Sequence, residues 1–343
     1  MEPISKFVKV RCPKCKNEQI IFGKVSTTVE CLVCKNQFET NSKKYIGRTG
    51  IFGDRASNYI QNQCDFILIL GSRMSIPQIG YNYDLFAPNA KKVIVDISKN
   101  ELNKINLKKY IKINCDLKFF INELNNNLKK EKNLNHNNWL KKCNKLKIKY
   151  PVLKESQSHI NKSRLINSFK FIDVLSKESK KNEIIVTDMG TSFTCTMQTF
   201  QTKSNQRLFT SSGLAAMGFG LPGAIGAIMA NNNKKRVLCI TGDGGLMFNI
   251  QEIQTALTHN LKLKLIIIDN QGYLTQKLMM KKNFKRYAGA HPPSGVSCPD
   301  FSKVAKSFGF KCDTINNDVS MPKKLRKILS NNKAHFCIIK IHY

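Results

Sequence analysis

An acid and an amide each follow an apolar run in the second half of the chain. Asp243 lies in a glycine-rich turn after one run, and Asn270 follows the next run within the triplet "NQG". Glycines let a backbone approach a phosphate closely, and a helix that begins after such a turn offers it free N–H groups. Mg²⁺ prefers carboxylate, amide and carbonyl oxygens as ligands. We therefore predict a Mg²⁺–diphosphate site built from Asp243, Asn270 and the carbonyl of Gly272.

Four cysteines near the N-terminus have the spacing of a metal site. Cys12, Cys15, Cys31 and Cys34 follow the pattern C-x₂-C-x₁₅-C-x₂-C. Four thiolates complete a tetrahedral Zn²⁺ shell with no open position, so such a site is structural rather than catalytic. The alternatives are four incidental cysteines or a redox C-x-x-C pair. Two pairs at this spacing favour zinc.

The composition is that of a globular protein with a strong positive charge. The 343 residues leave room for two or three domains, and 41% of them are hydrophobic. A net charge of +33 is compatible with binding to RNA, DNA or an anionic membrane. In residues 45–343, however, the lysines are scattered among asparagines without arginine clusters. That pattern favours solvated basic faces over a nucleic-acid site.

Cysteine usage and hydrophobicity bear on the compartment. The 12 cysteines do not form a disulfide framework and the N-terminus has no signal-peptide core, so we predict a cytoplasmic protein. The uncharged run at 213–230 is rich in glycine and contains a proline. It is predicted to be a buried core helix rather than a membrane span, and no membrane partner is expected.

Apolar runs alternate with amphipathic stretches, which predicts an α/β fold. The runs of buried-strand length are 65–70, 92–97, 183–188, 236–240, 263–269 and 337–341. The predicted helices are 116–128, 166–180, 213–230, 249–260, 300–308 and 323–330. Such alternation is typical of parallel sheets that helices cover on both faces.

The N-terminal segment resembles a ribosomal family. "SKFVKVRCPKCKNEQIIFGKVSTTVECLVC" is similar to the zinc-ribbon protein of the archaeal and eukaryotic small ribosomal subunit, family twenty-seven, over residues 4–36. The resemblance implies bound Zn²⁺ and contact with ribosomal RNA. The basic side chains that could contact phosphates, or could be plain surface charge, are Lys6, Lys9, Arg11, Lys14, Lys16 and Lys24. The chain departs from the family after these residues, which puts part of the ribosomal surface in doubt.

The rest of the chain resembles thiamine diphosphate enzymes. The spacing of the "GDG" and "NQG" motifs resembles that of their diphosphate-binding domain, and "SSGLAAMGFGLPGAIGA" matches the acetolactate synthase branch. The resemblance implies that Met217 wedges under the cofactor, unless it is only a core residue, and that the Ala215 carbonyl faces the 4′-amino group. It also implies cofactor contacts from two further turns, made by Gly190, Thr191 and Ser192 and by Gly242, Asp243, Gly244 and Gly245.

The resemblance extends upstream and defines domains. Residues 45–102 look like the central domain of these enzymes, which holds FAD in some relatives, although no residue here demands FAD. The predicted domains are a zinc ribbon at 1–44, a partial central α/β domain at 45–130, a connector at 131–163 and a diphosphate-binding domain at 164–343. The family's third domain binds the cofactor's pyrimidine and carries the activating Glu, and we find neither in this sequence. We therefore predict no catalytic residue in this chain.

Two functions from different classes follow. The first is a thiamine diphosphate- and Mg²⁺-dependent protein of the acetolactate synthase type, which decarboxylates 2-oxo acids and joins the products to acceptors. It is expected to be incomplete alone and to need a partner subunit with a pyrimidine domain, or a homo-oligomer. The alternative is a ribosomal zinc-ribbon protein that binds rRNA and carries an inert or artefactual fused domain.

The cysteine spacing makes a prediction that a metal assay can check. The wild-type chain should contain zinc, and Cys31→Ser should lose it because a three-thiolate shell is incomplete. Cys115→Ser, outside the four-cysteine set, serves as the matched control and should keep the metal. Chelation should unfold the N-terminal segment, which is too short to hold a core without metal. Equal, near-zero zinc in all three proteins would contradict the assignment.

Overall fold

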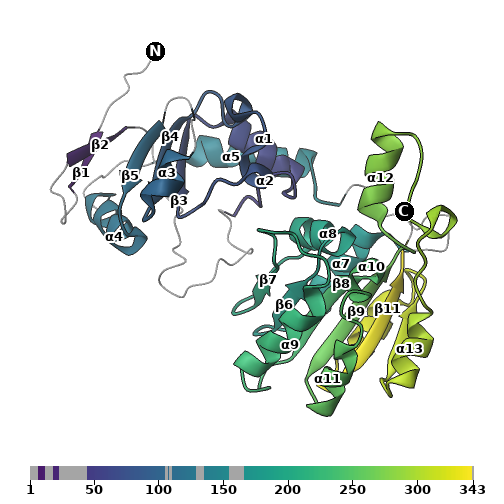
Figure 1. Cartoon of the computed structure of the whole chain (residues 1–343). Helices are drawn as coiled ribbons and strands as arrows, with labels where there is room; N and C mark the ends of the chain where they lie inside the picture. Colours follow the sequence, from purple (N-terminus) through teal and green to yellow (C-terminus); the bar gives the residue numbers. More distant parts are fainter. Residues whose placement is uncertain are drawn as a thin grey trace. The chain divides into compact units, whose positions relative to one another are not determined.

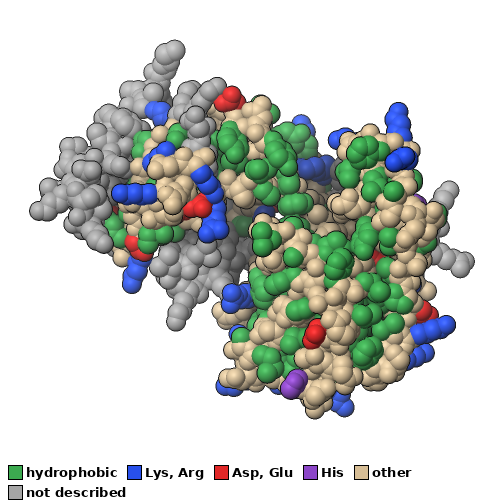
Figure 2. Space-filling model, in the orientation of Figure 1, with side chains coloured by type: hydrophobic (Ala, Val, Ile, Leu, Met, Phe, Trp, Pro, Cys, Tyr) green, Lys and Arg blue, Asp and Glu red, His purple; other side chains and the backbone are tan. Residues whose placement is uncertain are grey.

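The computed structural model describes residues 7–11, 18–22, 45–104, 107, 110–128, 135–153 and 166–341. The chain divides into two compact units, Met1–Val152 and Leu153–Tyr343 (Figure 1; Figure 2 is the space-filling view). The boundary between the units lies within the segment that the sequence predicts as a connector. The four cysteines of the predicted zinc site lie outside the described residues, so their arrangement stays a prediction.

The first two strands form a small sheet of their own. β1 (Phe7–Arg11) and β2 (Glu18–Phe22) pair antiparallel, with Phe7 opposite Phe22 and Arg11 opposite Glu18. They fall within the segment that the sequence predicts to be a β-rich ribbon.

The first unit also contains a parallel sheet in the order β3-β4-β5, built from β3 (Phe66–Leu70), β4 (Lys91–Asp96) and β5 (Tyr110–Asn114). Its helices are α1 (Arg55–Gln63), α2 (Ile76–Ile79), η2 (Tyr83–Leu85), α3 (Lys99–Asn103), α4 (Leu117–Leu128) and α5 (Asn137–Lys149). Two buried clusters lie on its faces. Ile94 and Leu102 belong to one cluster, and Val93 and Phe120 belong to the other.

Helix α5 lies within the predicted connector and packs on the first unit. Tyr150, just after α5, stacks on Tyr59 of α1 with ring centroids 4.5 Å apart. Arg55 donates to the carbonyl of Pro151 at 3.0 Å, and Lys147 donates to the carbonyl of Tyr45 at 3.0 Å. The segment is therefore an ordered helix over these residues and not merely a charged linker.

The second unit is a six-stranded parallel sheet in the order β10-β11-β9-β8-β6-β7. Its strands are β6 (Ile184–Thr187), β7 (Arg207–Phe209), β8 (Val237–Gly242), β9 (Leu263–Asp269), β10 (Cys312–Ile315) and β11 (His335–Lys340). Its helices are α7 (Ser168–Glu178), α8 (Thr191–Thr199), α9 (Gly220–Ala230), α10 (Asp243–Leu246), α11 (Glu252–Thr258), α12 (Leu274–Asn283), η3 (Pro292–Ser294), α13 (Phe301–Ser307) and α14 (Met321–Ile328). The predicted α/β fold is confirmed.

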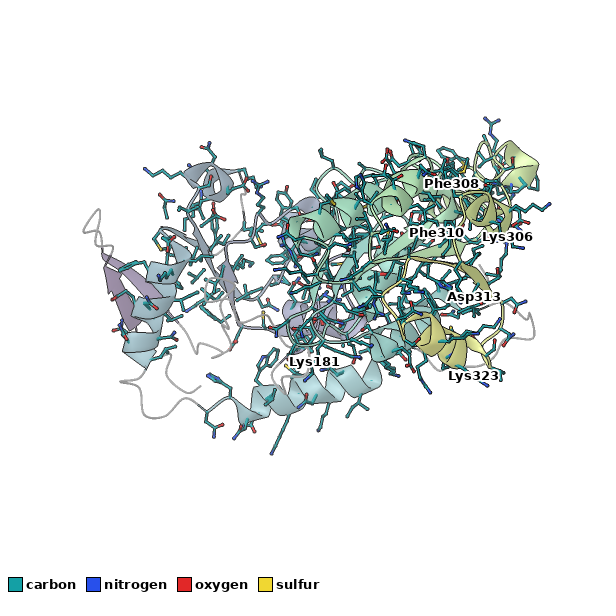
Figure 3. All side chains as sticks on the ribbon, turned by 90° about the horizontal axis from the view of Figure 1, so that it is seen from below. Lys181, Lys306, Phe308, Phe310, Asp313 and Lys323 are labelled. Carbon is teal, nitrogen blue, oxygen red and sulfur yellow. The ribbon has the colours of Figure 1, made fainter. Side chains whose placement is uncertain are left out.

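Helices cover both faces of this sheet (Figure 1). On one face, side chains of α7, α8 and α14 pack on alternate strand residues such as Ile240 and Ile266. On the other face, α9, α11 and α13 pack on the intervening residues such as Cys239 and Leu265. Burial on both faces explains why β8 and β9 are continuous apolar runs. At the edge of the second face, Phe310 (labelled in Figure 3) packs edge to face on Phe336, with ring centroids 6.0 Å apart.

The predicted helix over 213–230 is wrong in its first half. Helix α9 begins at Gly220, and the residues before it form exposed turns. Ala215 and Gly218 have φ angles of +55° and +88°, which a right-handed helix cannot contain. Strands β5, β7 and β10 and helices α1, α8 and α12 are among the elements that were not predicted. The three strands are short and mixed in polarity, and α12 has no buried face.

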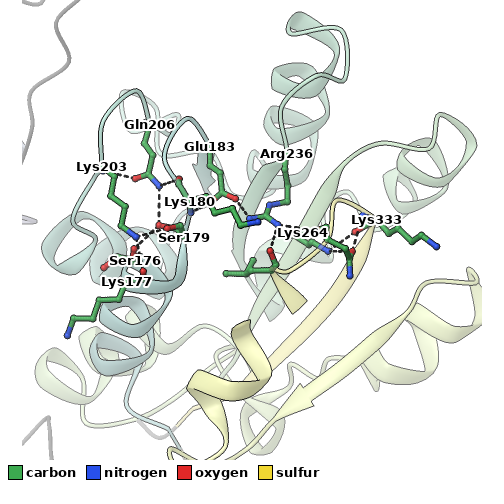
Figure 4. Close-up of polar contacts among 12 residues, drawn as sticks. Ser176, Lys177, Ser179, Lys180, Glu183, Lys203, Gln206, Arg236, Lys264 and Lys333 are labelled. Atoms are coloured by element: carbon green, nitrogen blue, oxygen red, sulfur yellow. Dashed lines mark hydrogen bonds and ion pairs between the residues drawn. The ribbon is translucent and has the colours of Figure 1, made fainter. Parts of the chain in front are cut away.

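The amino edge of the sheet contains a buried ion pair (Figure 4). Arg236 precedes β8, and its guanidinium pairs with Glu183, which precedes β6. The same guanidinium donates to the carbonyl of Leu329 at 2.6 Å and to that of Asn331 at 3.0 Å. A buried cation here therefore binds the turn that joins α14 to β11.

A second buried cation binds the same turn. Lys264, on β9, donates to Asn331 Oδ1 at 3.2 Å and to the carbonyl of Lys333 at 2.7 Å. Its side chain is fully buried. Burial, and secondarily the charge of Arg236, lowers the pKa of Lys264 to about 8. The folded chain therefore releases this proton at a lower pH than the unfolded chain does.

This shift predicts how stability depends on pH. From about pH 8 up to the ordinary lysine pKa of 10.5, the unfolded chain binds a proton that the folded chain has lost, so the free energy of unfolding should rise with pH. The full contribution is about 3 kcal/mol. Urea titrations across this range should show a smaller rise for Lys264→Met than for the exposed control Lys333→Met. Identical pH profiles for the two variants would contradict the prediction.

Candidate functional site

Three neighbouring strands of the second unit end at one edge of the sheet, where the motifs meet. β6, β8 and β9 are adjacent and parallel. Asp188 follows β6, Asp243 follows β8 and Asn270 follows β9. The carboxyl edge of a parallel sheet is where such folds bind ligands.

The carboxylate of Asp243 is almost fully buried and is surrounded by backbone N–H groups. Its Oδ2 accepts hydrogen bonds from the backbone N–H groups of Asn270 at 3.1 Å and Gly272 at 2.9 Å. Its Oδ1 accepts one from Gly244 N at 2.7 Å. Burial raises the pKa of Asp243 to about 6, and the N–H groups of Gly272 and Gly244 oppose that rise. The carboxylate thus lies where a bound cation would stabilise its charge.

The side-chain oxygen of Asn270 has no hydrogen-bond partner. Asn270 Oδ1 is buried and accepts nothing from the described residues, whereas its Nδ2 donates to Thr191 Oγ1 at 3.3 Å. A buried polar atom without a partner is uncommon and calls for an unseen ligand. An amide oxygen beside a carboxylate suits Mg²⁺, which takes oxygen ligands. The residues present therefore fit the predicted ion.

Glycines keep the space beside these ligands open. A Cβ on Gly244 would lie 2.4 Å from the ring of Tyr273. Gly272 has a φ of +129°, and a Cβ there would lie 2.5 Å from the carbonyl oxygen of Ala290. A side chain at Gly244 would require the Tyr273 ring to move, whereas one at Gly272 would require the backbone at Ala290 to move. Gly272 is thus required by its positive φ and by the close approach of a second backbone segment.

Asp188 was not among the predicted site residues, although its carboxylate accepts hydrogen bonds from three segments beside the site. Its Oδ1 accepts from the backbone N–H groups of Met189 at 2.7 Å and Gly218 at 3.0 Å, and its Oδ2 accepts from Thr241 Oγ1 at 2.9 Å. The carboxylate is 1% exposed. The only signal in the sequence was an acid at the end of a predicted strand, which does not reveal its partners.

The turn after β6 reaches the site through the start of α8. Gly190 caps α8 with a φ of +81°, and Thr191 is the next residue and accepts from Asn270. Ser192 is fully buried, and its hydroxyl donates to the carbonyl of Met189 at 3.0 Å. Ser192 could therefore meet a diphosphate only through its backbone.

Ala215 and Met217 lie on an exposed turn, and the structure places no other predicted site residue on it. Ala215 has a left-handed backbone and donates from its N–H to the carbonyl of Ser211 at 3.0 Å. Met217 is 38% exposed, so the alternative that it is only a core residue is wrong. Leu214, on the same turn, is 91% exposed. Phe248 is distant in the sequence but lies beside Gly218 in space, and it is 56% exposed.

Family models match three stretches of the chain. Residues 188–341 match "Thiamine pyrophosphate enzyme, C-terminal TPP binding domain", and residues 26–124 match "Thiamine pyrophosphate enzyme, central domain". Residues 3–40 match "Ribosomal protein S27". The second unit thus has the α/β fold of a thiamine pyrophosphate-binding domain. The predicted resemblances to both families are confirmed, and the central-domain match begins inside the ribosomal one.

Similar curated proteins are acetolactate synthase large subunits. The large subunit from Cyanidium caldarium is 31% identical over 314 residues, which are 90% of this chain and 52% of the relative. The probable large subunit from Methanocaldococcus jannaschii is 32% identical over 317 residues, 90% of this chain and 52% of the relative. Isozyme 1 of Escherichia coli K12 is 31% identical over 83% of this chain and 48% of its own length. The chain spans about half the length of these relatives.

The described residues contain neither a candidate membrane span nor a cluster of typical metal-binding side chains. Within them, no helix has both the length and the apolar character needed to cross a membrane. In the same part of the chain, no group of three or more His, Cys, Asp or Glu side chains is placed to hold a metal ion. The predicted Mg²⁺ ligands are one carboxylate, one side-chain amide and one backbone carbonyl. Only the carboxylate belongs to the four residue types named, so this finding does not bear on the predicted Mg²⁺ site.

The bonds of Asp188 lead to a stability prediction. Asp188→Ala should lower the free energy of unfolding of the second unit by about 3 kcal/mol or more, because two buried N–H groups and one hydroxyl lose their acceptor. Asp300→Ala, which removes an exposed helix cap, is the matched control and should cost about 1 kcal/mol. Urea unfolding measures both. Equal losses would show that Asp188 has no special role.

Proposed function

We propose that residues 45–343 provide the diphosphate- and Mg²⁺-binding part of a thiamine diphosphate enzyme of the acetolactate synthase type. The reaction is decarboxylation of a 2-oxo acid such as pyruvate, followed by joining of the remainder to an acceptor. The observation that carries the proposal is the unpartnered Asn270 Oδ1 beside the buried Asp243 carboxylate. The family matches and the similarity to large subunits support it.

Each residue of the site has a proposed task. Asp243 and Asn270 hold Mg²⁺ through side-chain oxygens, and Gly272 holds it through its carbonyl. The backbone N–H groups of the turn at 242–245 and of the start of α8 bind the diphosphate. When bound, thiamine diphosphate supplies the electron sink needed to break or form a bond next to a carbonyl. The protein's contribution is to fix the cofactor and to exclude water from it.

The exposed turn at 211–219 is proposed to meet a second protein domain. Leu214, Met217 and Phe248 present apolar surface in this region, and apolar surface of this kind often marks an interaction site. The proposed partner is a domain that binds the cofactor's pyrimidine and supplies the activating carboxyl group, from another subunit or a second copy of this protein. Without it, the lost acid–base group would reduce the rate by about 10²–10⁴-fold.

A second function rests on the N-terminal match. Residues 3–40 match "Ribosomal protein S27", a finding that favours a zinc ribbon that contacts rRNA through its basic residues. The two functions occupy different parts of the chain. Co-sedimentation of the wild-type chain with small ribosomal subunits, compared with Cys31→Ser, tests this alternative. A cytoplasmic location, as predicted from the sequence, suits either function.

Calorimetry tests the main proposal. Thiamine diphosphate with Mg²⁺ should bind the wild-type chain, and Asn270→Ala should weaken binding about tenfold or more, because a hydrogen-bonding or metal ligand to a charged partner contributes about 1.5–3 kcal/mol. Asn283→Ala, on the exposed end of α12, is the matched control and should bind as the wild type does. Pyruvate turnover should be near zero until a pyrimidine-domain partner is added. Equal cofactor affinity in the wild type, Asn270→Ala and Asn283→Ala would contradict the assignment of Asn270 as a Mg²⁺ ligand.

A further inference from the structure

The sheet of the second unit has two places where neighbouring connections diverge. After β6 the chain enters α8 on one face, and after β8 it enters α11 on the other face. The candidate site lies at this first divergence, at the carboxyl ends of β6 and β8. The same divergence recurs around β11, whose two neighbours in the sheet are β9 and β10. The chain after β9 passes through α12 and η3 to α13 on one face, whereas the chain after β10 enters α14 on the opposite face. Parallel sheets bind ligands outside the carboxyl ends of strands at such points.

A cavity lies at this second divergence. It has a volume of about 490 Å³ and is lined by the carboxyl ends of β9, β10 and β11 and by the loop before α13. The volume is within the range of small-molecule sites. Its polar lining comes from Asp269, Gln271, Ser297, Asp300, Ser302, Thr314 and Lys340.

The charges around the cavity select the ligand's charge. Asp269 at the end of β9 forms an ion pair with Lys340 at the end of β11. The Asp269 side chain is 8% exposed, whereas that of Lys340 is 40% exposed and reaches solvent. Asp300 adds a second carboxylate, which accepts from the N–H of Ser302 at 2.9 Å. The lining thus carries two carboxylates and one ammonium group. Because its net charge is negative, it repels a simple anion and favours a ligand with an ammonium group.

Neutral groups complete the lining. The hydroxyls of Ser297 and Thr314 and the side-chain amide of Gln271 make no hydrogen bond to the described residues. Cys298 also lines the cavity, and burial together with the charges of Asp243 and Asp269 raises its pKa to about 12. A thiol that stays protonated is a poor nucleophile. The lining therefore suits reversible binding through hydrogen bonds and ion pairs.

We propose that this cavity binds a small zwitterion, namely an amino acid or a molecule of similar size. The ammonium group of the ligand is held by the carboxylates of Asp269 and Asp300. Its carboxylate accepts from Lys340 and from the hydroxyls of Ser297 and Thr314. Each charged group of the ligand thus meets an opposite charge, and the net negative lining rejects a ligand that has a carboxylate alone.

The cavity shares one turn with the candidate site, and this part of the inference rests on the proposed function. Asp269 and Gln271 line the cavity, while the N–H groups of the intervening Asn270 and of Gly272 donate to Asp243. Gln271 has a φ of +59°, and its N–H donates to Asp269 Oδ1 at 3.3 Å. A ligand that moves Asp269 or Gln271 must therefore move the Mg²⁺ ligands. The affinity for Mg²⁺ should change a few-fold when the cavity is occupied, and the coupling must be reciprocal.

The experiment uses the full chain without Mg²⁺ or thiamine diphosphate, so its outcome does not depend on the proposed function. Individual protein amino acids at millimolar concentration are screened by saturation-transfer NMR, and hits are titrated by calorimetry. Ethylamine and acetate serve as probes that carry one charge each. The variants are Lys340→Met and Ser297→Ala, and the matched control is Lys323→Met on α14, outside the cavity lining (Figure 3). Unfolding midpoints verify that each variant is folded.

At least one amino acid should bind, and ethylamine and acetate should bind much more weakly. Lys340→Met should weaken binding about tenfold or more, Ser297→Ala a few-fold, and Lys323→Met not at all. Ser297 lies in a loop and has no partner to lose, so its effect cannot come from unfolding. No binding by any amino acid, equal binding of acetate, or identical affinity in all variants would overturn the proposal. The coupling needs a separate titration, in which Mg²⁺ is added to the chain with and without the bound amino acid. An unchanged Mg²⁺ affinity in that titration would overturn the coupling and leave the cavity assignment standing.

Discussion

A buried carboxylate, Asp188, joins three segments that are far apart in the sequence. It accepts from Met189 after β6, from Gly218 before α9 and from Thr241 on β8. The Cβ of an alanine at Gly220 or Gly245 would lie within 2.9 Å of its side chain. These glycines are therefore explained by the carboxylate rather than by backbone flexibility. The exposed turn before α9 has a defined position because Asp188 binds its end.

The second carboxylate of the site, Asp243, is in a different electrostatic situation. Backbone N–H groups satisfy it in part, yet burial still raises its pKa to about 6. The neighbouring Asn270 oxygen has no partner. Both features are costs to the folded chain, because buried polar groups without full compensation are destabilising. A bound cation would remove both costs at once, as expected of a binding site rather than of a structural ion pair.

The two edges of the sheet differ in how their charges are used. At the amino edge, Arg236 and Lys264 donate to carbonyl groups of one turn, and Glu183 compensates one of the two charges. That network is internally satisfied apart from Arg236 Nε, and its role is to hold the turn before β11. At the carboxyl edge, polar atoms at Asn270 and around the cavity remain available for ligands. Stability and binding thus occupy opposite ends of the same strands.

The sequence by itself determined the α/β class and the central strands of the sheet, because buried parallel strands are apolar runs. It also located Asp243, Asn270 and Gly272 at one edge of the sheet, because their motifs directly follow two of these strands. The short strands β7 and β10, the unburied helix α12 and the late start of α9 needed the tertiary structure, since their conformations depend on neighbours and on left-handed residues such as Ala215. The role of Asp188 and the cavity beside β11 also needed it. Both depend on which distant residues meet, and spacing along a chain does not encode that.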